Sequence, residues 1–161
     1  MATHFTLRVM LSTDCVKVKE IIDLSFSRFM GFFAYHSVQE EGQVLVCEVQ
    51  EAVAGFAKLT EFQISGGKYG CILWIAVHPD FRRKGVASVL SLVGINRLKL
   101  NGAKAVFAST QRRNASALAV LGRNGFRRIG FLELRRLFGW RVFQFYRDIW
   151  LAPGEIVLMH D

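Results

Sequence analysis

The chain has little proline, little cysteine and no long apolar run, and each shortage excludes a class of protein. Only 2 prolines occur in 161 residues, and no tract rich in serine or glycine is present, which argues against a disordered linker. The apolar run Ile72 to Val77 is far too short to cross a bilayer. The N-terminal residues lack a charged region followed by an apolar one, so we expect neither a secretory signal nor a membrane partner.

The three cysteines, Cys15, Cys47 and Cys71, are scattered along the chain. They show neither the spacing of metal ligands nor a disulfide framework, so we expect no metal and a reducing, cytoplasmic compartment. By contrast, the chain is 52% hydrophobic and contains 14 phenylalanines. This length and composition suit a sizeable core, and we predict a single domain over residues 1–161.

Charge is distributed unevenly along the chain. Residues 1–81 carry 6 Lys and Arg against 9 Asp and Glu, a net charge of −3, whereas residues 82–161 carry 15 against 4, a net charge of +11. Such a field favours an anionic ligand on the second half. It does not distinguish a nucleotide from a nucleic acid or an acidic protein, and solvated arginines account for much of it.

Hydrophobic periodicity predicts alternating strands and helices. Helices are expected over 14–29, 86–101 and 114–125, and residues 30–36 form an aromatic loop or a short helix. Strands are expected over 5–10, 43–49, 53–60, 69–77, 105–109, 126–131, 142–146 and 156–159. This order predicts an α/β fold with a mixed sheet and helices on both of its faces.

The stretch from Val77 to Ala87 carries the most specific chemical signal. A buried strand is broken by Pro79 and Asp80, and a basic loop containing Gly85 then opens into a helix. A strand–turn–helix of this kind directs backbone N–H groups and the positive end of the helix dipole to one point. It predicts an anion site, with a pyrophosphate as the natural occupant.

Two motifs, in this order, resemble those of one large family. Ile75-Ala76-Val77-His78-Pro79 precedes Arg82-x-x-Gly85-x-Ala87, and Asn114-x-x-Ala117-x-x-x-Leu121-x-x-x-Gly125-Phe126 follows after a helix and a strand. Together they resemble the pyrophosphate loop and the second cofactor motif of the GNAT superfamily of acyl-CoA-dependent N-acyltransferases. The resemblance covers residues 44–130 well. It implies a mixed, mostly antiparallel central sheet flanked by helices on both faces.

The resemblance also implies how the co-substrate acetyl-CoA is bound. Backbone N–H groups from Arg83 to Ala87 would cradle the pyrophosphate, and Gly85 lets the backbone approach closely. The strand edge before the loop would hydrogen-bond the pantetheine like an added strand. Asn114 would reach the pantetheine, although taken alone this residue is better explained as a helix N-cap. The cofactor-binding residues implied are Ile75, Ala76, Val77, Arg82, Arg83, Lys84, Gly85, Val86, Ala87, Asn114, Ala117 and Leu121.

The groups that would move protons are missing from their usual places. Many family members carry a tyrosine where this chain has Leu121, and several N-terminal acetyltransferases carry a glutamate where it has Ser109. The general acid and base are therefore unassigned. Weak candidates for these proton-transfer groups are Tyr146, Ser109 and Glu61. His36 and His78 are further candidates. Cys71 as an acylated nucleophile is less favoured than Cys71 as a small buried hydrophobe.

Three functions follow from these patterns. The first is an N-acetyltransferase that moves an acetyl group from acetyl-CoA to a primary amine by direct attack; the acceptor is a protein N-terminus, a lysine or a small amine. The alternative is an acyl-CoA-binding sensor or scaffold with weak or no catalysis. The third is nucleic-acid or ribosome association through C-terminal arginines interleaved with Phe138, Trp140 and Phe143. A homodimer interface accounts for those aromatics equally well.

Overall fold

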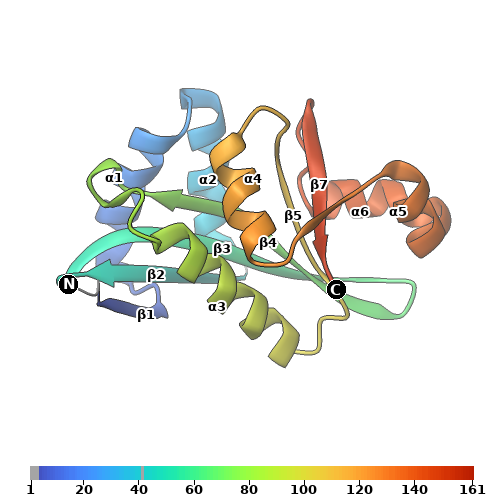
Figure 1. Ribbon diagram of the computed structural model, residues 1–161, viewed down its shortest axis with the longest axis horizontal. Coiled ribbons are helices and arrows are strands. Elements are labelled where there is room, and N and C mark those ends of the chain that lie inside the picture. The colour runs from blue at the N-terminus through green and yellow to red at the C-terminus, as the bar shows by residue number, and fades with distance from the viewer. Residues whose placement is uncertain (1–3, 41) are drawn as a thin grey trace. The chain divides into compact units, whose positions relative to one another are not determined.

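The computed structural model describes residues 4–40 and 42–161 (Figure 1). Contacts divide the chain into two compact units: Met1–Leu59 with Trp74–Gly94, and Thr60–Leu73 with Ile95–Asp161. The long strands β3 (Ala52–Ile64) and β4 (Gly67–Val77) contribute residues to both units. Helix α3 (Val86–Leu100) begins in the first unit and ends in the second.

The described strands hydrogen-bond in the order β1-β2-β3-β4-β5-β7-β6. Pairing is antiparallel between β1 and β2, β2 and β3, β5 and β7, and β6 and β7, whereas β4 and β5 run parallel. The predicted mixed, mostly antiparallel α/β sheet is therefore confirmed. The turn between β2 and β3 uses Gln50 and Glu51 at φ 51° and 63°, which is the left-handed pair that a tight hairpin requires.

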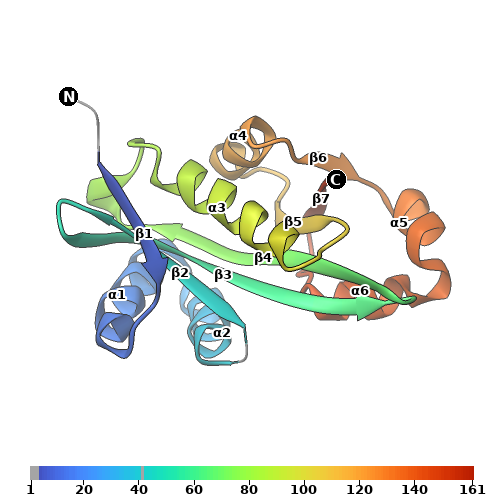
Figure 2. The same ribbon diagram turned by 90° about the horizontal axis from the view of Figure 1, so that it is seen from below.

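The first unit contains β1 (Phe5–Val9), β2 (Gln43–Val49), α1 (Cys15–Ser25) and α2 (Arg28–Gln39). The short 3₁₀ helices η1 (Ser12–Asp14) and η2 (Pro79–Phe81) precede α1 and the loop before α3. In Figure 2, α1 and α2 lie on one side of the strands and the start of α3 on the other. The alternation of the strands explains this, because Phe56 packs in the core beneath α1 and α2 while Gly55 faces α3.

The aromatic segment 30–36 is helical and belongs to α2. Ser27 caps this helix, because its hydroxyl accepts the Met30 N–H at 3.3 Å. The apolar repeat that predicted one helix over 14–29 is divided at Phe26, which is extended at φ −121°. Two short helices therefore stand where the sequence predicts one helix followed by an aromatic loop or a short helix, and the second of these alternatives is the one found.

The second unit contains the C-terminal strands and helices. These are β5 (Val106–Gln111), α4 (Ala115–Arg123), β6 (Arg127–Ile129), α5 (Phe131–Phe138), η3 (Gly139–Arg141), α6 (Val142–Asp148) and β7 (Glu155–His160). Its core joins α5 and α6 to the sheet through Phe107, Phe138 and Phe145. The rings of Phe107 and Phe145 meet edge to face at 4.7 Å.

Residues 142–146 form helix α6 rather than the predicted closing strand. Leu134, Phe138, Val142, Phe145 and Ile149 are all buried, and their spacing of three or four residues is that of a helix face. The predicted strand over 126–131 is likewise shorter, since only Arg127–Ile129 is extended. Burial of Phe138 also removes it from the set of exposed aromatics, whereas Trp140 and Phe143 remain exposed.

Candidate functional site

The loop between β4 and α3 curls back on itself just before the helix begins. Arg83 and Gly85 both have positive φ, 60° and 92°, a conformation that glycine adopts freely and arginine does not. His78 supports the preceding turn by accepting the Asp80 N–H on Nδ1 at 3.3 Å. The Gly85 carbonyl then accepts the Val89 N–H at 3.0 Å, which begins the helical hydrogen bonding of α3.

Helix α3 begins at Val86, directly after Gly85. The first N–H groups of an α-helix have no carbonyl partner within the helix. Gly85 is exposed and Ala87 half-buried, while the Val86 side chain is buried. The start of α3 thus offers N–H groups and a positive dipole end to an anion.

The basic side chains of this loop differ in where they lie. Arg82 turns back onto its own unit, because Nε donates to the Val77 carbonyl at 3.1 Å and the guanidinium donates to the Ser25 hydroxyl at 3.3 Å. The Lys84 ammonium lies 5.2 Å from the centre of the Phe81 ring. Arg82 therefore braces the loop against the end of β4 and α1, which its sequence position does not reveal.

The edge of β4 before the loop is a second feature of the first unit. The ladder between β4 and β5 pairs only Gly70, Cys71 and Ile72 of β4. The backbone from Ile75 to Val77 lies beyond that ladder. Such an edge is able to hydrogen-bond an extended ligand in the manner of an added strand.

The second predicted motif is built in the second unit as a helix with both ends capped. Asn114 is the N-cap of α4, and its Oδ1 accepts the Ala117 N–H at 3.1 Å. Among residues 4–40 and 42–161, no acceptor is described for the side-chain N–H₂ of Asn114. Leu121 is buried and Ala117 half-buried. Gly125 closes the motif at φ 87°, a left-handed residue after the helix.

A carboxylate that sequence reasoning missed lies beside Ser109. The Ser109 hydroxyl on β5 donates to Oε2 of Glu155 on β7 at 2.9 Å, and the Ala152 N–H donates to the same oxygen at 3.1 Å. The antiparallel register pairs Ser109 with Val157, so Glu155, two residues away, lies on the same face of the sheet. No local pattern signals this contact, because the two residues are 46 positions apart and meet only through strand pairing.

Cys71 and Tyr146 belong to the core of the second unit. Burial raises the pKa of the Cys71 thiol, and the nearby charge of Glu155 raises it further. Burial likewise raises the pKa of Tyr146, which lies on α6 and packs against the apolar core. A thiol held protonated is a poor nucleophile, so the structure gives no support to a Cys71 acyl intermediate.

The weak candidate Glu61 is held by other side chains. It forms an ion pair with Lys68 at 2.7 Å and accepts a hydrogen bond from the Asn101 side chain at 2.7 Å. Burial alone would raise the pKa of Glu61, but these two partners lower it below its usual value. Asn101 precedes β5, whereas Ser109 lies near its other end, so the structure does not bring Glu61 and Ser109 together.

The histidines of the first unit are also separate from the Ser109 pair. The His36 ring lies on α2 against Phe32, with 4.4 Å between ring centres. His78 Nε2 is 3.6 Å from a Glu20 carboxylate oxygen. Neither contact identifies a proton-transfer group.

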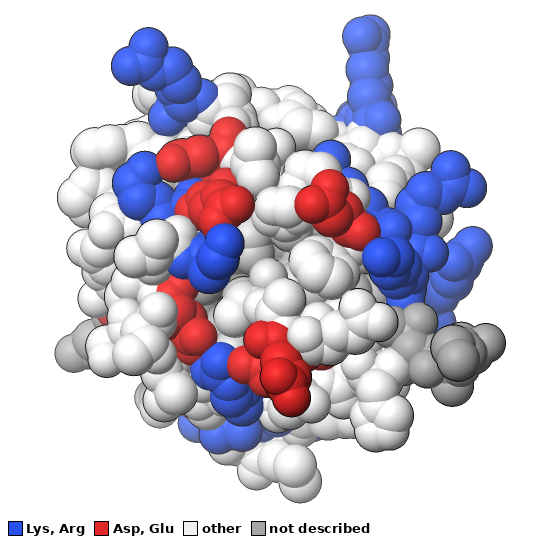
Figure 3. Space-filling view, turned by 90° about the vertical axis from the view of Figure 1, so that its left-hand side faces the viewer, with Lys and Arg blue, Asp and Glu red and all other residues white. Residues whose placement is uncertain are grey.

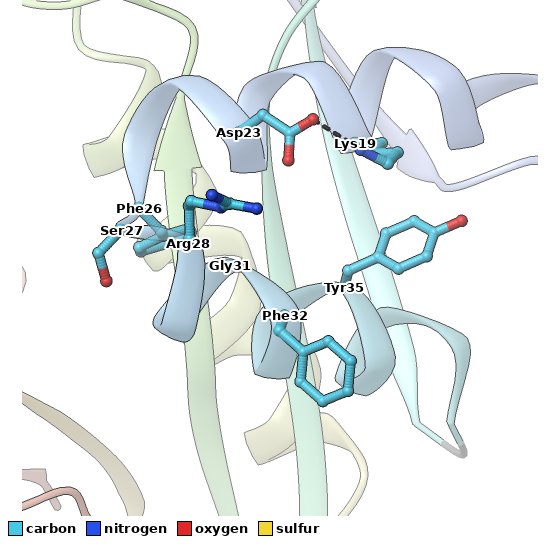
Figure 4. A pocket seen from close by; sticks show the side chains of 8 residues that line it. All are labelled: Lys19, Asp23, Phe26, Ser27, Arg28, Gly31, Phe32 and Tyr35. Carbon is cyan, nitrogen blue, oxygen red and sulfur yellow. Dashed lines mark hydrogen bonds and ion pairs between the residues drawn. The ribbon is translucent and has the colours of Figure 1, made fainter.

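A pocket of about 420 Å³ lies between α1 and α2 (Figure 4). Its polar wall includes the Lys19–Asp23 ion pair, 2.7 Å long, and its apolar wall includes Phe32 and Tyr35. Both aromatics belong to the segment 30–36, which the sequence predicts to be an aromatic loop or a short helix. The complete lining is Lys19, Asp23, Phe26, Ser27, Arg28, Gly31, Phe32 and Tyr35.

Two absences hold for the residues that the structure describes. No group of three or more His, Cys, Asp or Glu side chains in 4–40 and 42–161 is placed to hold a metal ion. Within the same ranges, no helix has both the length and the apolarity of a membrane span.

Comparison with known proteins gives one family and a set of similar folds. The model of the acetyltransferase (GNAT) family matches residues 14–126, and no curated protein matches the chain significantly. A GNAT-family protein of Desulfovibrio desulfuricans is 19% identical, with a TM-score of 0.75, 98% of this chain covered and 99% of that one. The acetyltransferase of Bacillus subtilis, solved in complex with CoA, is 18% identical, with a TM-score of 0.71 and the same coverage.

An Escherichia coli N-acetyltransferase named for an alanine of a ribosomal protein is also similar. It is 17% identical, with a TM-score of 0.68, 98% of this chain covered and 93% of that one. At these identities the three structures show a shared fold.

Proposed function

Because the chain belongs to the acetyltransferase (GNAT) family, whose model matches well over half of it, we propose that it transfers an acetyl group from acetyl-CoA to a primary amine. Acyl transfer from CoA is the activity of the family. The acetyl donor, the amine acceptor and the residues that serve them are what we propose for this chain. The observation that carries it is the loop from Arg83 to Ala87, in which Arg83 and Gly85 hold positive φ directly before the first turn of α3.

This loop suits the pyrophosphate of CoA. Backbone N–H groups from Arg83 to Ala87, including those of Lys84 and Gly85, hydrogen-bond the phosphate oxygens, and the helix dipole adds a favourable field. The positive φ of Gly85 aims these groups together without a Cβ in the way. Arg82 contributes by fixing the loop to Val77 and Ser25 rather than by direct contact.

The remaining cofactor residues have complementary roles in the proposal. The strand edge Ile75–Val77 receives the pantetheine amides, and the amide of Asn114 donates to the same arm while its Oδ1 caps α4. Ala117 and Leu121 give that arm an apolar wall. Val86 serves through its backbone, since its side chain is buried.

The chemistry is direct attack of the amine nitrogen on the thioester carbonyl carbon. Primary amines are mostly protonated at neutral pH, with a pKa of about 10.4 for lysine and about 8 for an α-amino group, so a base must take a proton before or during attack. Breaking the C–S bond releases the CoA thiolate. No step passes through Cys71, whose thiol stays protonated.

The acceptor is proposed by class only. One structural neighbour is named as a ribosomal-protein-S18-alanine N-acetyltransferase and another as an IAA acetyltransferase, so the named acceptors differ among proteins of this fold. A protein N-terminus, a lysine and a small amine are therefore all to be tested.

Release of free CoA thiol from acetyl-CoA, measured across a panel of amines, tests the proposal. We expect amine-dependent release that saturates with acetyl-CoA. Micromolar CoA binding without release in the presence of any amine would instead support the second candidate, an acyl-CoA sensor. The observations that favour that candidate are Leu121 and Ser109, which stand where family enzymes place a tyrosine and a glutamate.

A further inference from the structure

We propose that Glu155 is the base that accepts the amine proton, and that Ser109 positions its carboxylate; this inference rests on the proposed acetyl transfer. The resemblance to N-terminal acetyltransferases leads us to expect a glutamate at position 109, where this chain has Ser109. In the structure, the carboxylate of Glu155 on the neighbouring strand contacts the Ser109 hydroxyl.

The location is set by strand register. Ser109 lies on β5 five residues before Asn114, the N-cap of α4. Glu155 begins β7, and its Oε2 is 2.9 Å from the Ser109 hydroxyl oxygen. The Glu155 carboxylate therefore lies in hydrogen-bond contact with the Ser109 side chain.

The Glu155 carboxylate is oriented and still available. Oε2 accepts both the Ser109 hydroxyl and the Ala152 N–H, which fixes the plane of the group. In the described parts of the chain, Oε1 accepts no hydrogen bond. Both Ser109 and Glu155 are half-buried rather than sealed in the core, so Oε1 is open to an amine or to a bridging water.

Among the described residues, Glu155 is the one acidic side chain of the second unit that forms no ion pair. Glu61 pairs with Lys68, Glu133 and Asp161 pair with Arg127, and Asp148 pairs with Arg147. Glu155 has no cationic partner within ion-pair distance among residues 60–73 and 95–161, which the structure describes in full. A carboxylate hydrogen-bonded on one oxygen and unneutralised on the other is arranged for proton transfer.

The proton balance is complete without a further reactant. An ammonium group loses one proton to Glu155, its nitrogen lone pair forms the new C–N bond, and the C–S bond breaks with its electron pair on sulfur. The amide nitrogen loses its second proton, the CoA thiolate gains one, and the proton held on Glu155 returns to solvent. The net products are the acetylated amine, CoA thiol and one proton.

The test compares E155Q with S109A, S109T and the double variant S109E/E155Q. D148N is the matched control, since Asp148 lies on α6 in an ion pair with Arg147 and has no part in the site. Turnover of acetyl-CoA is measured with the best amine of the panel between neutral and alkaline pH, together with CoA affinity and the thermal midpoint.

For E155Q we expect kcat to fall about 100-fold or more near neutral pH, while CoA affinity and the thermal midpoint stay close to wild type. The deficit shrinks at alkaline pH, where the amine deprotonates without help. S109A has a smaller deficit, S109T restores the hydroxyl and the activity, and S109E/E155Q recovers much of the loss by returning a carboxylate from β5. D148N behaves as wild type.

Retention of kcat within about threefold in E155Q, with the wild type active, would overturn the role of Glu155 and leave the acetyltransferase proposal standing. A pH-independent loss in E155Q accompanied by loss of CoA binding would also overturn it, because the residue would then be structural. Absence of amine-dependent turnover in the wild type itself would overturn both proposals together.

Discussion

In the loop after β4, backbone conformation prepares the proposed anion site more than side-chain charge does. Arg82 is engaged with Val77 and Ser25, while Gly85 holds a left-handed φ of 92° directly before the first turn of α3. Most residues avoid this region of φ because their Cβ meets the backbone. The glycine is therefore the residue on which the loop conformation depends.

G85A is expected to weaken CoA binding about tenfold or more, because strain at positive φ shifts the loop and turns its N–H groups away from the pyrophosphate. The measurement is CoA affinity by calorimetry. G102A is the matched control, since Gly102 has a φ of 94° and nothing within 4 Å of an added Cβ. G102A therefore carries the same strain of an alanine at positive φ, but it lies outside the proposed CoA site. Equal CoA affinity in G85A and wild type would contradict the assignment.

Residue-scale prediction from sequence was uneven for a physical reason. The motif residues around Gly85 and Asn114 were predicted because their roles follow from local backbone geometry, a left-handed turn and a helix N-cap. Glu155 was not, since it meets Ser109 only through the register of β5 and β7. Spacing along the chain carries no information about such a contact.

Between elements, close approach of β3 to α3 is what places the start of that helix. A Cβ built on Gly55 would lie 2.8 Å from the Ala76 carbonyl oxygen and 3.0 Å from a Val86 methyl group. Real side chains do not tolerate such distances to backbone atoms. A glycine at this position in β3 thus lets β4 and α3 pack above it.

G55A is expected to lower the free energy of unfolding by about 1–3 kcal/mol through overpacking. Denaturant unfolding measures this directly. At Gly122 in α4 an added Cβ meets nothing within 4 Å, so G122A is expected to raise stability by about 0.5–1 kcal/mol. Equal stability of the two variants would contradict the packing described for β3 and α3.

A second junction joins β1, β2 and η1 through Arg8. Its guanidinium donates to both Asp14 oxygens, at 2.6 and 3.0 Å, and also contacts Glu48. Hydrogen bonding from Arg8 lowers the pKa of Asp14 despite burial, with further help from the Leu11 N–H. A lowered folded pKa adds stability that is present above the ordinary aspartate pKa of about 3.9 and is lost as pH falls through the folded value.

D14N is expected to cost about 1–3 kcal/mol at neutral pH and to flatten the loss of stability below about pH 4. Thermal unfolding from pH 3 to pH 7 follows both effects. The control is D23N, whose Lys19 ion pair is exposed and should change stability by less than about 0.5 kcal/mol. An unchanged acid limb in D14N would show that the Arg8 junction contributes nothing to pH dependence.

The sequence predicts an element well where a continuous apolar run is bounded by a turn, or where caps mark both ends of a helix. The strands β2 and β3, with their consecutive buried residues, and the capped helix α4 are examples. The prediction failed for residues 142–146, because Val142 and Phe145 pack as a helix face together with Phe138 of the preceding helix. Short apolar runs fit both periods, and only the tertiary core decides between them.

At the scale of the whole molecule, charge explains less than the net value of +8 implies. The face drawn in Figure 3 carries acidic side chains among lysines and arginines. The ion pairs of the molecule include Lys17 with Glu20 and Arg127 with Glu133, each pair neutralising one positive charge. Trp140 is exposed, and the Arg135 guanidinium lies 4.4 Å from the centre of its ring. Nucleic-acid association and a homodimer through this surface both stay predictions. The α/β class, by contrast, was predictable, because it depends on the order of many elements rather than on any one contact.

The most direct measurement is mass spectrometry of the amine product after incubation with acetyl-CoA. We predict that an amine of the panel gains one acetyl group on nitrogen for each CoA thiol released. We also predict that G85A slows both events because it binds CoA more weakly. Release of CoA thiol with every amine left unmodified, or CoA binding with no release at all, would contradict the proposed acetyl transfer.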